Sequence, residues 1–444
     1  MGGGELSTRK TIFFLHGFGA PFAIHSRGLF GTAGMNIAIL HYSVPPIVGG
    51  VESVIAHHAR LMSADGYSVR LIAARGESLP TGGCANEQIP LTVISLADSQ
   101  HERVGKMKAQ LDHGEVTKDF ESLRDALVNE LQTALSDVDI LIAHNVCSLN
   151  KNLALTAALH QLHTSRELPR LILWHHDLAW TTPRYQPEMH AGYPWDLLRT
   201  DWGNTSHVVV SELRRAELAE LMKLDPASIC VIPNGVDTAR FYKLESQTQT
   251  VLEQTHLLDA APILLLPVRI TPRKNIELAL HTLAELRKQF PNAALVVTGP
   301  LGPHNADNRK YFDMLSSLRA QLGLQHSARF LAELIDSFLP DEVIADFYRI
   351  ADALFFPSRE EGFGIPLLEA AFSRLPAFCA DIPPLRELGL SDAAFFSPDE
   401  NPAKIADMLA EYFRSSFPAR LSMRARSSFR WEAIYRQRIA PLLD

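Results

Sequence analysis

The sequence has only four cysteines, and no two of them form a C-x-x-C pair. Cysteines so few and so far apart exclude a disulfide framework and a zinc site built from cysteine pairs. They are typical of a reducing compartment, so we expect a cytoplasmic location. Long hydrophobic runs are missing too: the run at residues 263–268 has the length of a strand, whereas a membrane-spanning helix needs roughly 20 residues. Contact with a membrane would be peripheral at most.

An excess of positive charge is also missing, because 42 Lys and Arg face 50 Asp and Glu for a net charge of −8. Nonspecific binding of nucleic acid needs the opposite balance, so nucleic acid is not an expected partner. One stretch departs from this balance: residues 414–438 contain seven arginines and one acidic residue, Glu432. Two interpretations stay open for it, namely contact with anionic lipid or a phosphorylated acceptor, and a solvated face with salt bridges. Nothing in the sequence indicates an oligomeric state.

The length of 444 residues predicts two or three domains at about 150 residues each. From Met35 onward, short β-rich apolar runs alternate with stretches of helical period, which is the pattern of parallel sheets covered by helices. Turn residues at 225–237 interrupt the alternation, so we place a first domain at 35–232 and begin a second at 233. For residues 1–34 two interpretations stay open: an extension upstream of a true start at Met35, and a genuine disordered leader.

The expected elements of the first domain are strands at 36–42, 68–73, 91–95, 140–144, 171–175 and 207–211, and helices at 51–64, 118–135, 151–164 and 212–222. Those of the second are strands at 263–269, 294–298, 328–331, 353–356, 377–379 and 393–396, and helices at 275–289, 309–322, 340–350, 365–373 and 402–413. Parallel sheets bind ligands beyond the carboxyl ends of their strands. Functional residues should therefore follow strands and line a cleft between the domains.

Two glutamates seven residues apart follow a predicted strand in the segment 357–370, PSREEGFGIPLLEA. Gly362 and Gly364 can bring backbone N–H groups close to an anion at the start of a helix. Glu369 lies two helical turns after Glu361, where a carboxylate can accept both hydroxyls of a ribose. A surface turn followed by an ordinary helical glutamate is the alternative.

A second group, Arg269, Arg273 and Lys274, also follows a predicted strand. A nucleoside diphosphate needs positive charge from two directions, and a loop holding Arg269 and Lys274 five residues apart can supply it. Arg273 is the weaker member of the group, and a solvated basic turn is the alternative.

The glutamate segment resembles the E-x7-E motif of retaining GT-B glycosyltransferases, especially glycosyltransferase family 4. Other segments agree: residues 268–274 resemble its phosphate clamp, 232–237 (IPNGVD) its interdomain segment, and 45–52 (PPIVGGVE) its first N-domain loop. The resemblance covers roughly residues 35–440.

This resemblance implies an α/β fold of the GT-B type, with two facing, doubly wound, Rossmann-like domains and a cleft between them. The second domain would then span 233–415, and residues 416–444 would return to the first domain, anchored by Trp431. The family usually has glycine where this sequence has Arg374, at a position that suits a left-handed cap.

In family terms, the second domain binds the donor. Glu369 would hold the ribose, Arg269 and Lys274 the diphosphate, and Glu361 the sugar hydroxyls. The remaining donor-site residues would be Gly362, Phe363, Gly364 and Arg273 in the second domain and Gly49 and Gly50 in the first. A glycine pair alone indicates a tight turn as readily as a site.

Histidines end two strands of the first domain, at His144 (IAHN) and at His175 and His176 (WHHD). Adjacent strand residues point to opposite sides, so one of the pair can face the cleft while the other packs behind it. The family's histidine near the reacting centre corresponds best to His176, and we place His144 and Asp177 on the acceptor side. A zinc site would need a third ligand that the sequence does not indicate.

Aromatic residues gather in the segment 174–202, where Trp180 and Tyr185 follow the histidines. Sugar rings stack on aromatic side chains, so this loop is a candidate acceptor pocket, and a packed structural loop is the alternative. The D-x-D triplet Asp137–Asp139 precedes its strand instead of ending one, so no metal is expected there.

The sequence therefore predicts a retaining hexosyltransferase that moves a hexosyl unit from a UDP- or GDP-sugar to a hydroxyl acceptor without a metal or other cofactor. The acceptor class, whether glycan, lipid or small molecule, stays open. A nucleotide-sugar epimerase or sugar phosphorylase of the same fold is the alternative, and a sugar-binding module without catalysis is a further one.

Overall fold

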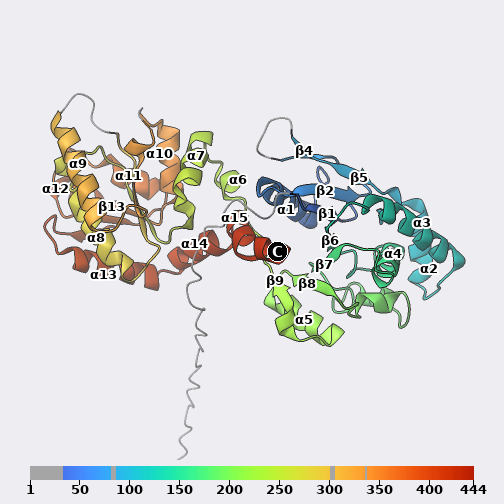
Figure 1. Ribbon diagram of the computed structural model, residues 1–444. Coiled ribbons are helices and arrows are strands. Elements are labelled where there is room, and N and C mark those ends of the chain that lie inside the picture. Colours follow the sequence, from blue (N-terminus) through green and yellow to red (C-terminus); the bar gives the residue numbers. More distant parts are fainter. Residues whose placement is uncertain (1–33, 82–86, 301–305, 336–337) are drawn as a thin grey trace, which may run out of the picture.

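The computed structural model describes residues 34–81, 87–300, 306–335 and 338–444. They form two α/β lobes joined at their middle (Figure 1). The extension expected at residues 1–34 lies, except for Gly34, outside the described residues.

The N-lobe is built on a parallel sheet of order β5-β2-β1-β6-β7-β8-β9. Its strands are β1 (Asn36–Leu40), β2 (Ser68–Ala73), β5 (Leu91–Val93), β6 (Ile140–His144), β7 (Arg170–His175), β8 (Thr205–Val209) and β9 (Ile229–Val231), and a hairpin pairs β3 (Leu79–Pro80) with β4 (Gln88–Ile89). Its helices are α1 (Gly50–Ala64), α2 (Glu102–Leu111), α3 (Lys118–Ala134), α4 (Leu153–Thr164) and α5 (Glu212–Met222). The central strands are apolar throughout because helices cover both faces of the sheet.

The C-lobe repeats this plan with the order β12-β11-β10-β13-β14-β15. Its strands are β10 (Ile263–Leu266), β11 (Ala294–Val297), β12 (Ala328–Phe330), β13 (Ala353–Phe356), β14 (Ala377–Ala380) and β15 (Ala394–Phe396). Its helices are α7 (Ser246–Thr255), α8 (Ile276–Arg287), α9 (Ala306–Gln321), α10 (Asp341–Ile350), α11 (Ile365–Phe372), α12 (Pro383–Gly389) and α13 (Pro402–Ser415), and α6 (Thr238–Tyr242) precedes them. Two doubly wound parallel sheets confirm the α/β fold class expected from the sequence.

The end of the chain returns to the N-lobe through α14 (Phe417–Ser428), α15 (Trp431–Ile434), a π-helical turn (Tyr435–Ile439) and α16 (Ala440–Leu443). The Trp431 ring stacks on His57 at 5.0 Å, and the Tyr435 hydroxyl donates to Asp65 at 2.7 Å. Ile434 and Ile439 are buried in the hydrophobic core of the N-lobe. These contacts confirm that the C-terminal helices cross back, and Figure 1 shows them at the junction of the lobes.

The arginines of residues 414–438 divide into two groups. Four of the seven bind the body of the chain: Arg426 pairs with Asp352, Arg430 and Arg436 pair with Asp259, and Arg438 donates to the carbonyl of Val231. Arg414, Arg420 and Arg424 are exposed. Most of the stretch is therefore structural.

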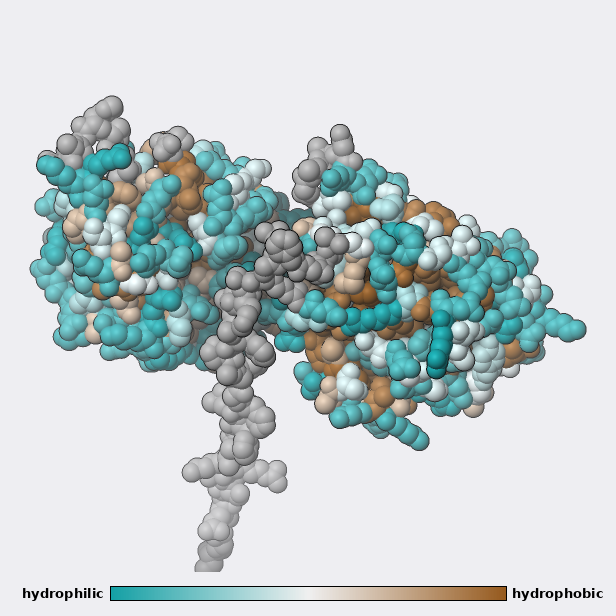
Figure 2. All heavy atoms as spheres, viewed as in Figure 1, coloured by the Kyte–Doolittle hydropathy of each residue, from teal (hydrophilic) through white to brown (hydrophobic). Residues whose placement is uncertain are grey.

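Within the described ranges, no helix is both long and apolar enough to span a bilayer. Hydrophilic residues cover most of the face shown in Figure 2, and hydrophobic ones gather in separate patches. Phe363 and Ile365, at the start of α11, are 54% and 59% exposed, although the apolar residues of the surrounding strands are buried.

Candidate functional site

Each sheet reverses its strand order once, between its first and fourth strands. In the C-lobe the reversal lies between β10 and β13, and in the N-lobe between β1 and β6. Loops at the carboxyl ends of two such strands diverge, and the crevice they leave is where open α/β sheets bind ligands. The candidate site is therefore built from four loops, two in each lobe.

Two charged residues predicted from the sequence meet at the C-lobe reversal. Lys274, after β10, donates to Glu361, after β13, with Nζ 2.5 Å from Oε1, and both side chains are only 9% exposed. The same loops are joined by the N–H of Arg359, which donates to the carbonyl of Arg273 at 2.8 Å. Asn275, the residue after Lys274, also links the two loops, because its side-chain amide donates to the carbonyl of Pro357. The basic loop and the glutamate loop thus form one unit.

Arg269 and Arg273 lie on the same basic loop as Lys274, and both are exposed. No ion pair fixes either guanidinium within the described part of the chain. Exposed guanidinium groups beside a buried ammonium group provide positive charge from more than one direction, which is what a diphosphate requires.

Glu369 stands exposed on α11, and one of its oxygens is held in place. The hydroxyl of Tyr348, on α10, donates to Oε2 of Glu369 at 2.6 Å. Burial, reinforced by this carboxylate, raises the pKa of Tyr348. Tyr348 therefore stays a hydrogen-bond donor and orients the glutamate, leaving Oε1 for a ligand. Sequence reasoning missed Tyr348 because it lies outside any motif.

Gly364 begins α11 in a left-handed conformation, with φ +108°. A Cβ added there would lie 2.5 Å from Cδ2 of Leu385, so backbone conformation and packing both require glycine. Gly362 and Phe363 are exposed just before it. Within the first turn of α11, Pro366 has no N–H and the N–H of Leu367 donates to the carbonyl of Gly364 at 3.0 Å. Only the N–H groups that precede Pro366 are therefore left to bind an anion.

The N-lobe histidines pair across neighbouring strands. His176, after β7, has its Nε2 3.0 Å from Nδ1 of His144, the last residue of β6. His175 turns to the other side and meets His207 of β8 at 3.1 Å. The adjacent histidines thus point in opposite directions, as expected. His144 is fully buried, so it reaches a ligand only through His176.

Burial makes these histidines poor bases. It lowers the pKa of His176 to about 3, with a contribution from the nearby His41, and it lowers the pKa of His144 well below its ordinary value. Both rings are therefore neutral at physiological pH. His176 can exchange hydrogen bonds with a ligand, but it does not offer a positive charge.

Asn145 holds the turn that carries His176, although sequence reasoning did not select it. Its backbone is left-handed, with φ +59°, and it is buried. Its Oδ1 accepts the N–H of His176 at 2.7 Å and that of Asp177 at 3.3 Å. The only signal was its place directly after the strand that ends at His144.

The Gly49–Gly50 turn begins α1, and a side chain of the protein already lies against it. A Cβ on Gly49 would come within 1.9 Å of the carboxylate of Glu52. Ser43 donates to the same carboxylate at 2.7 Å. An anion approaching this helix end would meet a like charge, whereas a sugar hydroxyl would meet an acceptor.

Of the residues predicted on the acceptor side, Asp177 forms ion pairs, whereas Trp180 and Tyr185 pack on the hydrophobic core. Asp177 lies between two arginines, 3.6 Å from Arg184 and 3.7 Å from Arg214. Trp180 and Tyr185 pack on the N-lobe core, and the Trp180 Nε1–H donates to a backbone carbonyl. Between the N-lobe and C-lobe sets of site residues, no hydrogen bond or ion pair occurs in the described parts of the chain.

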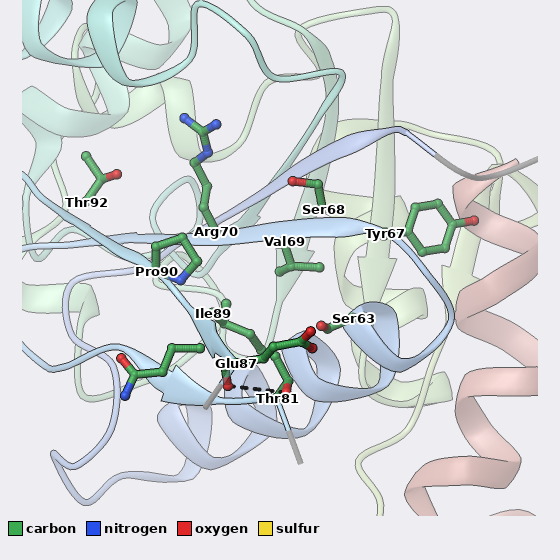
Figure 3. Close-up of a pocket in the computed structure, with 11 residues that line it drawn as sticks. Ser63, Tyr67, Ser68, Val69, Arg70, Thr81, Glu87, Ile89, Pro90 and Thr92 are labelled. Carbon is green, nitrogen blue, oxygen red and sulfur yellow. Dashed lines mark hydrogen bonds between the residues drawn. The ribbon is translucent and has the colours of Figure 1, made fainter. Parts of the chain in front are cut away.

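Two other features lie away from these loops. Asp137 pairs with Arg70, Asp139 accepts the N–H of Asn36, and no group of three or more His, Cys, Asp or Glu among the described residues is arranged to hold a metal ion. A surface groove of about 500 Å³ lies along α1, β2, β4 and β5, where Thr81 donates to the carbonyl of Glu87 (Figure 3). It borders the first residues of β2, opposite the carboxyl ends, and contains none of the predicted site residues.

Two family profiles match the chain. The profile described as Glycosyltransferase Family 4 matches residues 48–240, and the one described as Glycosyl transferases group 1 matches residues 249–428. The first spans most of the N-lobe, and the second spans the C-lobe through α14. Both loops of the C-lobe reversal lie inside the second match.

Relatives of known activity are similar over most of their length. Mannosylglucosylglycerate synthase of Petrotoga mobilis is 25% identical over 73% of this chain and 81% of its own. D-inositol 3-phosphate glycosyltransferase of Kineococcus radiotolerans is 25% identical over 91% of this chain and 89% of its own. Among solved structures, sucrose-phosphate synthase from Thermosynechococcus elongatus is 17% identical, with a TM-score of 0.34 over 92% of this chain and 98% of that one.

The two matches account for both lobes in chain order. The chain belongs to glycosyltransferase family 4 and is a hexosyltransferase of GT-B architecture.

Proposed function

We propose that the protein transfers a hexosyl unit, with retention of anomeric configuration, from a nucleoside-diphosphate sugar to a hydroxyl acceptor, and that it needs no metal ion. The observation that carries this proposal is the buried Lys274–Glu361 pair at the strand-order reversal of the C-lobe. The proposal assigns Lys274 to the diphosphate and Glu361 to the sugar hydroxyls, and it is supported by their contact. Glu369, two helical turns further along, is then placed to accept the ribose hydroxyls.

In this proposal the bond between the anomeric carbon and the phosphate oxygen breaks, and charge develops on the departing diphosphate. Lys274 and Arg269 stabilise that charge, as a divalent cation does in other transferases. The acceptor oxygen bonds to the anomeric carbon from the same face, and its proton passes to the departing phosphate oxygen. No carboxylate nucleophile is needed, which agrees with the ion-paired state of Glu361.

The names of the relatives favour a small polar acceptor over a lipid, because one is a mannosylglucosylglycerate synthase and another acts on an inositol phosphate. We include such an acceptor in the proposal. The three described free cysteines fit the proposed cytoplasmic location.

Calorimetric titration of the purified protein with UDP, GDP and ADP in EDTA tests the donor site. We expect micromolar binding of one nucleotide, weakened at least tenfold in Lys274→Ala and in Glu369→Ala. Lys106→Ala, at an exposed ion pair with Glu102 on α2 of the N-lobe, is the matched control and should bind as the wild type does. Binding of no nucleotide, or binding only with a divalent ion, would contradict the proposal.

The same preparation separates the alternative activities. A transferase releases nucleoside diphosphate in proportion to acceptor, whereas an epimerase changes the sugar without any acceptor and a phosphorylase needs inorganic phosphate. Donor binding without turnover under all three conditions would favour a binding module.

A further inference from the structure

The hydrogen bond between His144 and His176 has a direction that the surrounding atoms determine. The two rings are neutral, so one nitrogen of the pair carries the proton and the other accepts it. His144 uses Nδ1, and His176 uses Nε2. The choice of donor decides which nitrogen of His176 carries its own proton, and therefore what His176 presents to a ligand.

A proton on Nε2 of His144, the second ring nitrogen, would be energetically unfavourable. This nitrogen is buried and has no hydrogen-bond partner among the described residues. The indole of Trp174 stacks on the His144 ring at 5.1 Å, and the ring of His58 lies at 5.6 Å. Unpaired buried N–H groups are rarer in proteins than unpaired acceptors. The proton of His144 is therefore best placed on Nδ1, where it has a partner.

The backbone around His144 is fixed as well. Its carbonyl accepts a hydrogen bond from Nδ1 of His41 at 2.7 Å, because a carbonyl oxygen can only accept. The next residue, Asn145, binds the N–H of His176. Both sides of the His144–His176 contact are thus held by other groups, so the rings keep their relative orientation.

We propose that His144 is a positioning residue that donates its Nδ1 proton to Nε2 of His176 and so holds His176 in the Nδ1–H tautomer. His176 then offers an N–H donor, at a nitrogen with no partner among the described residues, to an oxygen of the bound donor substrate. The ligand part of this inference rests on the proposed function, and the tautomer part does not.

This arrangement removes His176 as a base. Its Nε2 lone pair is used by His144, and its Nδ1 already carries a proton. The proton of the acceptor hydroxyl must therefore leave by another route, which agrees with its transfer to the departing phosphate. His176 acts by binding an oxygen, and its contribution depends on a residue that never touches the substrate.

Nitrogen-15 NMR of the full-length protein with ring-labelled histidine tests the tautomer directly, because protonated and imine nitrogens resonate in separate regions. In the wild type we expect Nδ1 of His176 to be the protonated nitrogen. In His144→Phe, which keeps a ring but loses the donor, His176 should shift toward the Nε2–H form that free histidine prefers. In His144→Asn, whose amide nitrogen lies near the former Nδ1, the wild-type form should return.

Kinetics of the same variants tests the role in transfer. We expect kcat/KM to fall about tenfold in His144→Phe and to recover to within threefold in His144→Asn. His207→Phe is the matched control, because it breaks the equivalent pair with His175 one strand away; it should leave both the His176 spectrum and kcat/KM unchanged.

A wild-type spectrum with His176 protonated at Nε2 would overturn the proposal. This measurement does not depend on how the variants fold. An unchanged His176 tautomer in a folded His144→Phe would also overturn it. If the spectra follow the expectation while no nucleotide binds, the histidine pair stands and the proposed transferase function fails.

Discussion

Lys274 and Glu361 come from loops after neighbouring strands, and each is the buried counter-ion of the other. Removal of one partner leaves an unpaired charge in a poorly solvated place. We expect Lys274→Met or Glu361→Leu alone to lower the free energy of unfolding by about 3 kcal/mol. The double variant should recover most of that loss but bind no nucleotide, as urea titrations and calorimetry can show. A loss in the double variant equal to the sum of the two single losses would mean that the pair contributes little.

The start of α11 offers a comparison of two glycines. Gly364→Ala should lower the free energy of unfolding by about 2 kcal/mol, because φ is positive there and the new Cβ would lie 2.5 Å from Leu385. Gly362→Ala is the control, since its Cβ would enter open space without a positive φ. Thermal unfolding of both variants measures the difference. Similar melting temperatures would contradict the assigned backbone conformation.

Tyr348 should affect donor binding without touching the sugar. Tyr348→Phe removes the hydroxyl that donates to Glu369 and leaves the carboxylate free to rotate. We expect nucleotide affinity to fall roughly fivefold, equivalent to about 1 kcal/mol, and kcat at saturating donor to stay near the wild-type value. A fall in kcat with unchanged affinity would place Tyr348 in a different role.

The buried histidines predict loss of stability in acid. Burial lowers the pKa of His58 to about 3 and that of His41 to about 4, whereas an unfolded histidine titrates near 6.5. Between about pH 4 and 6.5 the unfolded chain binds protons that the native chain does not, so stability falls as the pH falls. From pH 7 to pH 5 each such histidine should remove roughly 2 kcal/mol.

His58→Phe tests this assignment, because neither ring nitrogen of His58 has a hydrogen-bond partner in the described structure. From pH 7 to pH 5, the free energy of unfolding of the His58→Phe variant should fall by roughly 2 kcal/mol less than that of the wild type. Urea titrations at the two pH values measure it. An equal pH dependence in both proteins would count against a neutral, buried His58.

The buried and the exposed C-terminal arginines are expected to differ in how much they contribute to stability. Arg426 donates to both oxygens of the buried Asp352 and to two backbone carbonyls, so Arg426→Met should lower the free energy of unfolding by about 3 kcal/mol or more. Arg424 lies two residues before Arg426 on α14 and is exposed. Arg424→Ala should therefore change the free energy of unfolding by less than about 0.5 kcal/mol. A weak effect of Arg426→Met would show that the pair does not anchor α14.

The fold was largely predictable because its strands are continuous apolar runs with recognisable ends. Strand 140–144 and helix 212–222 have the predicted bounds, although Ser211, which was assigned to the preceding strand, caps the helix with its side chain. Arg374 does adopt the left-handed conformation that its position required, with φ +56°. By contrast, α7 was missed because SQTQTVLEQT has too few apolar residues to indicate a buried face.

The candidate site was predictable only where a motif or a strand end marked it. Lys274 and Glu361 were selected separately, and their pairing follows from the neighbouring positions of β10 and β13. Tyr348, Asn145 and Glu52 were not selected, because their roles come from contacts made in three dimensions.

The return of the C-terminal helices has a consequence for how the protein is made. Ile434, Tyr435 and Ile439 belong to the same buried cluster as Ile37 and Ile39 of the first strand. A ribosome releases those residues only after the strands of both lobes have been synthesised. The N-lobe emerges first, but its core cannot close until α15 and the π-helical turn have been synthesised. The C-lobe sheet is complete at residue 396, so the C-lobe has all its strands before the N-lobe core is closed.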